Sequence, residues 1–224
     1  ASPRGKPREA LRFAMPTNAI ATEANEYVLG TDEIELARLG VQHRLWSDAA
    51  AALWRVGRVQ PGMTVLDLGC GPGHASFDLA QLVGPTGRVI GVDVSERFVS
   101  SYNRRSEAIA AMDGVRIARA YQGEAHTLAE TLATELKAGA TIDAVYCRWM
   151  LCFVPNPEEV IASLAKVVRP GGVVMVQDYF NYESMTLAPR RDEMTRVVAA
   201  SAQSIRHHGG DPDIMGRLPG MLRA

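Results

Sequence analysis

Three glycines at alternate positions follow a short apolar run in the segment VLDLGCGPGH, residues 65–74. They are Gly69, Gly71 and Gly73, and Asp67 stands two positions before the first of them. Glycine has no side chain and adopts positive φ readily, so such a loop turns sharply and lets a flat ligand approach its backbone. A helix that begins directly after the loop points its free amide groups at any anion there. The segment therefore predicts a nucleoside-binding loop.

A second carboxylate ends the next apolar run. Asp93 closes RVIGVD, residues 88–93, and lies 20 residues after Gly73. A carboxylate at this position can accept hydrogen bonds from two ribose hydroxyls. Together the loop and the carboxylate indicate an adenosine compound. They do not say which one, because dinucleotide-binding sites use the same arrangement.

The spacing disfavours two common nucleotide sites. The nicotinamide fingerprint is G-x-G-x-x-G, whereas the glycines here read G-x-G-x-G, and no tyrosine has a lysine four residues on, as a short-chain dehydrogenase requires. No Gly-Lys-Ser/Thr follows the loop, which excludes a P-loop. The cysteines Cys70, Cys147 and Cys152 form no C-x-x-C pair, so we expect neither a disulfide framework nor a metal site.

Short β-type runs alternate with helical stretches around these residues. This alternation predicts an α/β fold with a doubly wound, mostly parallel sheet that is covered by helices on both faces. In such a sheet the ligand lies beyond the carboxyl ends of the strands, near the point where the strand order reverses. The expected strands are 64–68, 88–93, 115–120, 142–147 and 172–178, and the expected helices are 74–83, 96–112, 126–137 and 157–168.

A further helix is expected before the first strand. Thr31 is its predicted N-cap, and Asp32 and Glu33 follow in the first turn, where carboxylates suit the helix dipole. Apolar residues recur at spacings of three and four, so we expect one apolar face to pack on the sheet domain. That expected face consists of Ile34, Ala37, Val41, Leu45, Ala49, Leu53 and Val56.

Length and composition set broader limits. The chain has 224 residues, 47% of them hydrophobic, which suits one α/β domain. Its formal net charge of −1 gives no broad basic surface, so a nucleic-acid substrate is disfavoured. No apolar run reaches the roughly 18 residues of a membrane span, and the basic start lacks the apolar core of a signal peptide. We therefore expect a cytoplasmic protein without a membrane partner.

Five motifs in order and in register resemble those of the class I S-adenosylmethionine-dependent methyltransferases, in the small-molecule branch similar to the ubiquinone-biosynthesis C-methyltransferases. VLDLGCGPGH resembles the family's first motif, GVDVS its ribose-binding strand end, and QGEAHTL its adenine loop. DAVYCRWMLCFVPNP resembles the fourth motif, and LAKVVRPGGVVMVQD resembles the helix, turn and strand of the fifth. The upstream YVLGTDEIELARLGVQHRLW resembles an N-terminal helical cap. The resemblance covers residues 25–180.

The resemblance implies S-adenosylmethionine as the cofactor and a small-molecule methyl acceptor as the partner. The backbone around Gly69 and Gly71 would hold the methionine portion, with Asp67 behind it, and Gly73 would let the helix pack closely. Asp93 would bind the ribose. The cofactor-binding residues implied in all are Tyr27, Asp67, Gly69, Cys70, Gly71, Gly73, Asp93, Val94, Gly123, Glu124, Ala125, Cys147 and Arg148.

Other implied roles fall outside the glycine loop. Glu124, where the family more often has aspartate, would read the adenine edge together with the amide of Ala125. Cys147 would offer its carbonyl to the cofactor's ammonium group, and Arg148 would meet a carboxylate. Tyr27 would close over the cofactor.

Catalytic groups can be few in such an enzyme, because a sulfonium methyl is already activated and transfer depends on alignment and on water exclusion. If the nucleophile must lose a proton, Asp178 at the end of the fifth strand is the candidate base, and a carboxylate that binds its own loop is the alternative. We expect the apolar residues after the fourth strand to be packing residues rather than a substrate box. They are Trp149, Met150, Leu151 and Phe153.

The sequence leaves two classes of function open. The first is a methyltransferase that acts on an oxygen, nitrogen or carbon atom of a small metabolite. The second is a methyltransferase-like module that binds the cofactor, or a partner protein, without turnover. An NAD-dependent dehydrogenase is a less favoured third reading.

The expected organisation has four parts. Residues 1–24 form a flexible arm, 25–60 the helical cap, 61–180 the cofactor-binding core, and 181–224 a helical segment on the acceptor side. The family's fold has two further strands after the fifth, so the last strands would be missing and the fifth strand left as an open edge. We expect either a truncated chain or a second chain, such as another copy of this one, covering that edge.

Overall fold

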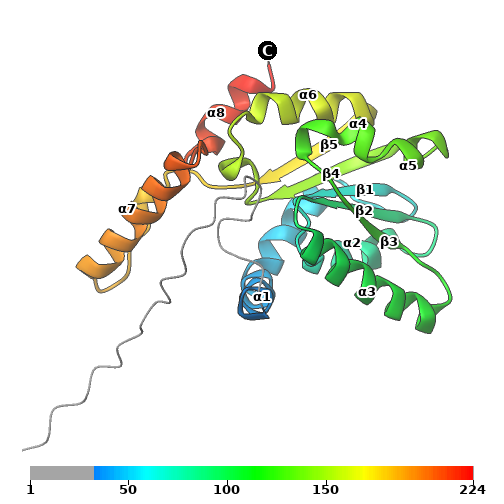
Figure 1. The fold of residues 1–224 in the computed structure, drawn as a ribbon, viewed down its shortest axis with the longest axis horizontal. Coiled ribbons are helices and arrows are strands. Elements are labelled where there is room, and N and C mark those ends of the chain that lie inside the picture. Colours follow the sequence, from blue (N-terminus) through cyan, green and yellow to red (C-terminus); the bar gives the residue numbers. More distant parts are fainter. Residues whose placement is uncertain (1–32, 224) are drawn as a thin grey trace, which may run out of the picture.

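The computed structural model describes residues 33–223, so Tyr27 and Thr31 lie outside the described residues. The described elements alternate between strands and helices along most of the chain (Figure 1). In chain order they are α1 (Glu33–Val56), β1 (Thr64–Leu68), α2 (His74–Val83), β2 (Arg88–Asp93), α3 (Glu96–Asp113), β3 (Ala118–Gln122), η1 (Ala125–Thr127), α4 (Leu128–Thr131), α5 (Ala133–Lys137), β4 (Ile142–Arg148), η2 (Leu151–Phe153), α6 (Pro157–Val167), β5 (Val168–Gln177), η3 (Tyr182–Ser184), α7 (Asp192–His207) and α8 (Ile214–Met221).

The five strands form one parallel sheet in the order β3-β2-β1-β4-β5. The order reverses between β1 and β4, which is the arrangement of a doubly wound fold, and the expected fold class is confirmed. All the carboxyl ends therefore point to one edge of the sheet, on the side of α1 and α7 (Figure 1). Among the described residues β5 pairs only with β4, so it is the edge strand that was expected.

Helices cover both faces of the sheet. Along β1, Val65 joins a core cluster with residues of α1, α2 and α3, and the next residue, Leu66, joins a second cluster with residues of α4, α6 and α8. This alternation follows from the two-residue period of a strand. Both sides of β1 are fully buried, which holds the loop at its carboxyl end on a rigid base.

Three expected elements differ from those observed. The strand expected at 115–120 is β3, which spans Ala118–Gln122. Residues 126–137 are not one helix but η1, α4 and α5, and the amide of Leu128 at the start of α4 donates to the hydroxyl of Ser163 in α6 at 3.0 Å. β5 begins at Val168 rather than at 172. A register shift between Val168 and Val173 accommodates the Pro-Gly-Gly turn inside the strand as a bulge.

The helix α1 forms where it was expected, but its expected apolar face is wrong. Ile34 is 80% exposed and Leu45 77% exposed, whereas Gly40, His43 and Trp54 are buried. Gly40 allows close approach to α2, and Trp54 places its ring edge-on to an aromatic ring of β4 at 5.4 Å between centroids. The packed face of α1 is therefore set by a small residue, a buried histidine and one large ring. The three- and four-residue spacing of apolar residues did not predict it.

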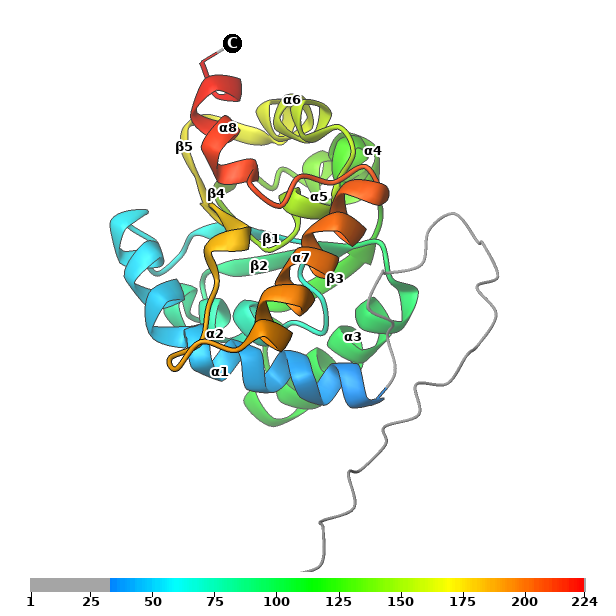
Figure 2. The ribbon, with the colours of Figure 1, turned by 90° about the vertical axis from the view of Figure 1, so that its left-hand side faces the viewer.

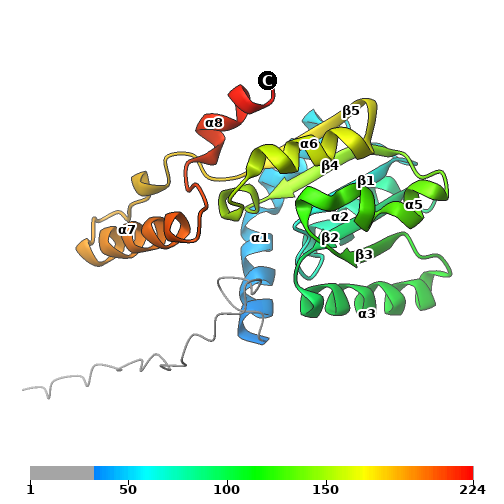
Figure 3. The same cartoon turned by 45° about the horizontal axis from the view of Figure 1, so that its top comes forward.

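The segment after β5 extends past the carboxyl edge of the sheet. In Figures 1 and 3 α1 lies between α7 and the sheet, and in Figure 2 α7 crosses in front of the strand ends. α8 returns to the sheet, where Ile214 and Leu218 are buried in the second core cluster. Within residues 33–223 no helix combines the length and the apolar character that crossing a membrane would require.

Candidate functional site

A cavity of about 670 Å³ opens at the carboxyl ends of the strands. The loops after β1, β2, β3 and β4 line it, and α1 contributes Arg38, Leu39 and Gln42 on one side. Its volume falls within the range of roughly 300–1,000 Å³ that is usual for small-molecule sites. The cavity lies where the strand order reverses, as a doubly wound sheet predicts.

The glycine loop joins β1 to α2 at the floor of the cavity. Gly69, Gly71 and Gly73 have φ of 71°, 52° and 88°, all in the left-handed region that favours glycine. A Cβ on Gly71 would meet no atom within 4 Å, so its bare backbone faces open space in the cavity. A Cβ on Gly73 would collide with the ring of Tyr102. Gly71 thus leaves room for a ligand, while Gly73 lets α2 pack closely.

Asp93 ties the end of β2 to this loop. One carboxylate oxygen accepts from the amide of Gly71 at 2.8 Å, and the other accepts from the amide of Ser95 at 2.9 Å. Burial raises the pKa of Asp93. Each carboxylate oxygen has a further lone pair that can accept from a hydroxyl in the cavity, which Asp93 lines.

Asp67 lies behind the loop and is almost completely buried. It accepts a hydrogen bond of 2.5 Å from the hydroxyl of Ser76 in α2. Burial raises the pKa of Asp67 to about 6, so it carries most of a negative charge at neutral pH. Asp67 also lines the cavity, and that charge therefore favours a cationic group nearby.

The loop after β3 forms another wall of the cavity. Gly123, Glu124 and Ala125 line it together with Val94 from the loop after β2. The amide of Gly123 donates to the carbonyl of Asp93 at 3.0 Å, which fixes this loop beside the one after β2. These four residues, which were predicted to bind the cofactor, therefore lie in two neighbouring loops at the cavity.

Arg148, the last residue of β4, lines the cavity from the other side of the glycine loop. Its Nη2 lies 3.1 Å from Nδ1 of His43, and Nε2 of His43 lies 2.9 Å from a carboxylate oxygen of Asp78. The Nη1 group of Arg148 is buried and has no hydrogen-bond partner within residues 33–223. Neither His43 nor Asp78 was predicted from the sequence: His43 lies within the segment that resembles a helical cap, where no role was implied for it, and Asp78 lies outside the motifs.

Aromatic residues continue this wall. Trp149 has φ of 50°, which is rare for a bulky residue, and its ring stacks on Tyr179 at 6.3 Å and meets Trp46 edge-on at 5.6 Å. Trp149, Met150 and Phe153 line the cavity, so the packing role expected for them is incomplete. Only Leu151 of that group is fully buried in the core.

Not every candidate residue lies at the cavity. Cys147 is buried in the second core cluster and Gly73 packs against Tyr102, so neither lines the cavity, although the carbonyl of Cys147 stays a candidate ligand. The carboxylate of Asp178 accepts from the amides of Cys152 at 3.2 Å and Tyr179 at 2.8 Å, and burial raises its pKa. Asp178 does not line the cavity either, which favours the loop-binding alternative over a catalytic base.

Comparisons with known proteins agree with this geometry. The sequence model of the family described as "Methyltransferase domain" matches residues 59–210. A demethylmenaquinone methyltransferase of Desulfitobacterium hafniense is 32% identical over 157 residues, which cover 68% of this chain and 58% of that protein. A trans-aconitate 2-methyltransferase of Variovorax paradoxus is 32% identical over 138 residues, 62% of this chain and 45% of that protein.

The fold is similar to that of solved structures. The crystal structure of a SAM dependent methyltransferase from Aquifex aeolicus matches with a TM-score of 0.53 and 20% identity, covering 66% of this chain and 73% of that one. The chain spans only 33% to 58% of the length of three curated proteins that it matches. Since the family model matches more than half of the chain, this protein belongs to the methyltransferase domain family.

Proposed function

We propose that this chain binds S-adenosylmethionine and transfers its methyl group to an oxygen, nitrogen or carbon atom of a small metabolite. The observation that carries the proposal is the order of the cavity's walls along the sheet edge. Glu124 follows β3, Asp93 ends β2, the glycine loop follows β1 and Arg148 ends β4, and these strands are neighbours in that order. An adenine, a ribose and an amino acid succeed one another in the same order along the cofactor.

The residues at each position have the chemistry that the corresponding part of the cofactor needs. Glu124 can accept from the adenine amino group, and Asp93 from the two ribose hydroxyls. The open backbone at Gly71 leaves room beside the ribose and the sulfur. The buried Nη1 of Arg148, which has no partner among the described residues, fits the methionine carboxylate, and the negative charge of Asp67 fits the ammonium group.

When bound, the cofactor supplies a methyl group already activated by the positively charged sulfur. The chain's own residues then need to orient the reactants and exclude water. Trp149, Met150 and Phe153 line the cavity with apolar surface that can keep water out, and Tyr179 lies beside Trp149. We infer that the acceptor enters between this wall and α1.

The named relatives act on small molecules according to their names, and a small-molecule acceptor is therefore part of the proposal. A cytoplasmic location and the absence of a nucleic-acid partner remain predictions from the sequence. So does a second copy of the chain that covers the open edge of β5.

Isothermal titration calorimetry of the full chain with S-adenosylmethionine, S-adenosylhomocysteine and NAD tests the proposal. We expect binding of the first two at one site and no binding of NAD. Binding of NAD alone would overturn the proposal and favour the dehydrogenase. Tight binding of the cofactor with no methylated product from any of a panel of metabolites, followed by mass spectrometry, would favour the module without turnover.

A further inference from the structure

We propose that His43 is a positioning residue, which Asp78 orients and which in turn holds the guanidinium of Arg148 ready to bind the carboxylate of the cofactor's methionine portion. This inference rests on the proposed function, because it assigns a role within the same cavity. It concerns two residues that were not among the predicted cofactor-binding residues and that do not line the cavity themselves.

The directions of the hydrogen bonds follow from the donor and acceptor groups. Arginine carries five N–H donors and no acceptor, so Nη2 of Arg148 must donate to Nδ1 of His43 at 3.1 Å. A neutral imidazole has one N–H, which is then on Nε2 and donates to the carboxylate of Asp78 at 2.9 Å. Asp78 therefore selects the tautomer in which His43 can accept from Arg148.

His43 is suited to this role because it stays neutral. Burial lowers its pKa, and the charge of Arg148 adds to the lowering, while Asp78 opposes it. A protonated His43 would present a second N–H and a positive charge to Arg148, and the hydrogen bond between them would be lost.

Arg148 is held on several sides. Its guanidinium carbon lies 4.9 Å from the ring centroid of Trp149 and 5.9 Å from that of Tyr146, both within cation–π range. The second terminal amino group, Nη1, is buried without a hydrogen-bond partner among residues 33–223. A buried donor without a partner costs free energy, so a ligand that accepts from it gains an interaction that the free protein lacks.

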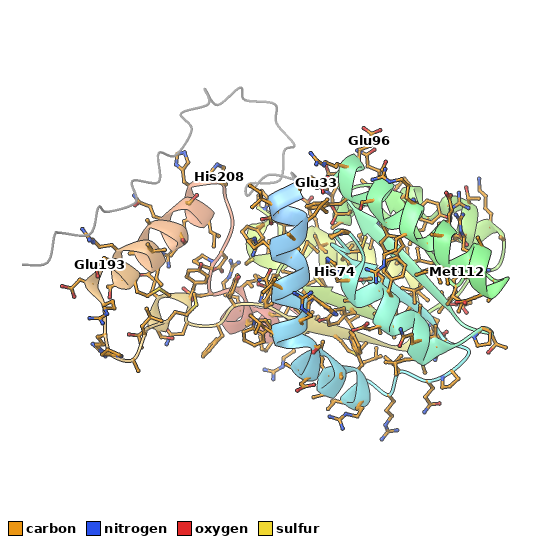
Figure 4. All side chains as sticks on the ribbon, turned by 90° about the horizontal axis from the view of Figure 1, so that it is seen from below. Glu33, His74, Glu96, Met112, Glu193 and His208 are labelled. Atoms are coloured by element: carbon orange, nitrogen blue, oxygen red, sulfur yellow. The ribbon has the colours of Figure 1, made fainter. Side chains whose placement is uncertain are left out.

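The two hydrogen bonds that link Asp78, His43 and Arg148 also connect three separate elements of the fold. Asp78 belongs to α2, His43 to α1 and Arg148 to β4. His43 stacks on His74, at the start of α2, with 5.8 Å between ring centroids, and Figure 4 shows His74 immediately beside α1. A Cβ on Gly40 would lie 3.4 Å from the His74 ring, so only a small residue lets α1 come this close.

Holding the guanidinium in advance matters because arginine has a long, flexible side chain. Ordering such a side chain at the moment of binding costs affinity, and a side chain that is already held avoids most of that cost. His43 should therefore raise the affinity for a ligand with a carboxylate at this position and leave other ligands unaffected.

A comparison of the affinities for two ligands isolates what Arg148 contributes to binding. S-adenosylhomocysteine carries the amino-acid carboxylate, and 5′-methylthioadenosine has the same adenosine and thioether without it. We expect Arg148→Ala to lower the ratio of their affinities, measured by calorimetry on the full chain, about 30-fold. His43→Phe keeps a ring of similar size without hydrogen-bonding groups, and we expect it to lower the ratio about tenfold.

Conservative and combined variants test the mechanism. His43→Asn places an amide oxygen near the position of Nδ1 and should restore most of the ratio. In the double variant of His43→Phe and Arg148→Ala the two losses should not add, because both act through the same guanidinium. Glu107→Ala, which removes an ion pair between α3 and Arg116 on the surface, is the control and should leave the ratio unchanged. Thermal unfolding of each variant shows whether it folds.

Other outcomes would overturn the inference. A folded His43→Phe variant that binds both ligands as the unchanged protein does, or weakens both equally, shows that His43 does not position Arg148. Additive losses in the double variant show the same. If the unchanged protein binds neither ligand, the proposed function fails and this inference fails with it, whereas a constant ratio with both ligands bound leaves the proposed function intact.

Discussion

The two sides of the cavity are built in different ways. On the nucleoside side, formed by the loops after β1, β2 and β3, the contacts join residues that are close in sequence: Asp93 accepts from Ser95, two residues on, and from Gly71, 22 residues before it. On the Arg148 side, His43 and Arg148 are 105 residues apart. If the cofactor binds as proposed, its nucleoside end depends on local loops, whereas its amino-acid end depends on how a separate helix packs.

The largest effect is expected from Gly73 on the nucleoside side. Gly73→Ala should lower the free energy of unfolding by about 4 kcal/mol, since the new Cβ collides with Tyr102 and the backbone has φ of 88°. Chemical denaturation measures this loss. Gly71→Ala is the matched control, because its Cβ meets open space, and it should cost only about 1 kcal/mol while weakening ligand binding. Equal losses in both variants would contradict the distinction between packing and ligand-facing glycines.

A pH-dependent effect is expected from Asp67, between the two sides. Its pKa is raised from 3.8 to about 6 in the folded state, so the folded protein holds this proton more tightly than the unfolded chain. The charged form therefore opposes folding as the pH rises from about 4 through about 6. Relative to the unchanged protein, Asp67→Asn should gain up to about 3 kcal/mol of unfolding free energy at pH 7.5, and the gain should disappear near pH 4. Denaturation curves at both pH values measure it, and a pH-independent difference would show that Asp67 is not buried as a carboxylate.

A change at Asp93 should weaken binding of two ligands equally, unlike a change at Arg148. Asp93→Asn should weaken binding of S-adenosylhomocysteine and of 5′-methylthioadenosine alike, by about 30-fold or roughly 2 kcal/mol, because the ribose is common to both. Calorimetry with the two ligands measures this effect. A change in the ratio of the two affinities, as expected for Arg148→Ala, would contradict this prediction. It would indicate that Asp93 contacts the amino-acid part of the cofactor rather than the ribose.

The smallest effect is expected from the outer face of α1. Leu45→Gln should change the free energy of unfolding by less than about 0.5 kcal/mol, as Leu45 is largely exposed. Trp54→Ala, on the packed face, should cost about 3 kcal/mol or more. If Leu45→Gln costs as much as Trp54→Ala, the helix packs by the face that the apolar pattern predicted.

These regions also differ in how far the sequence predicts them. The strands 64–68 and 88–93 were predicted with the observed bounds, because their apolar runs end at the glycine loop and at Asp93. The cavity-lining residues of the loops after β1, β2 and β3 lie in the predicted motifs, and their binding of the cofactor stays a prediction. The strand β4 was predicted as 142–147, one residue short of its observed end at Arg148.

The rest could not be predicted because it depends on packing between distant elements. His43 and Asp78 lie in the middle of two helices, where a histidine and an aspartate are unremarkable in sequence. The face of α1 is set by Gly40 and Trp54 against α2 and β4, not by the apolar spacing along the helix itself.

The outward position of Ile34 and Leu45 has a dynamic consequence. A helix that turns such residues to water is attached by little hydrophobic area, and segments with few buried apolar contacts open locally at a lower free energy than core strands. Backbone amides in the first half of α1 should therefore exchange with deuterium well before those of β1. Whenever this half of the helix opens, the imidazole beside Arg148 leaves with it.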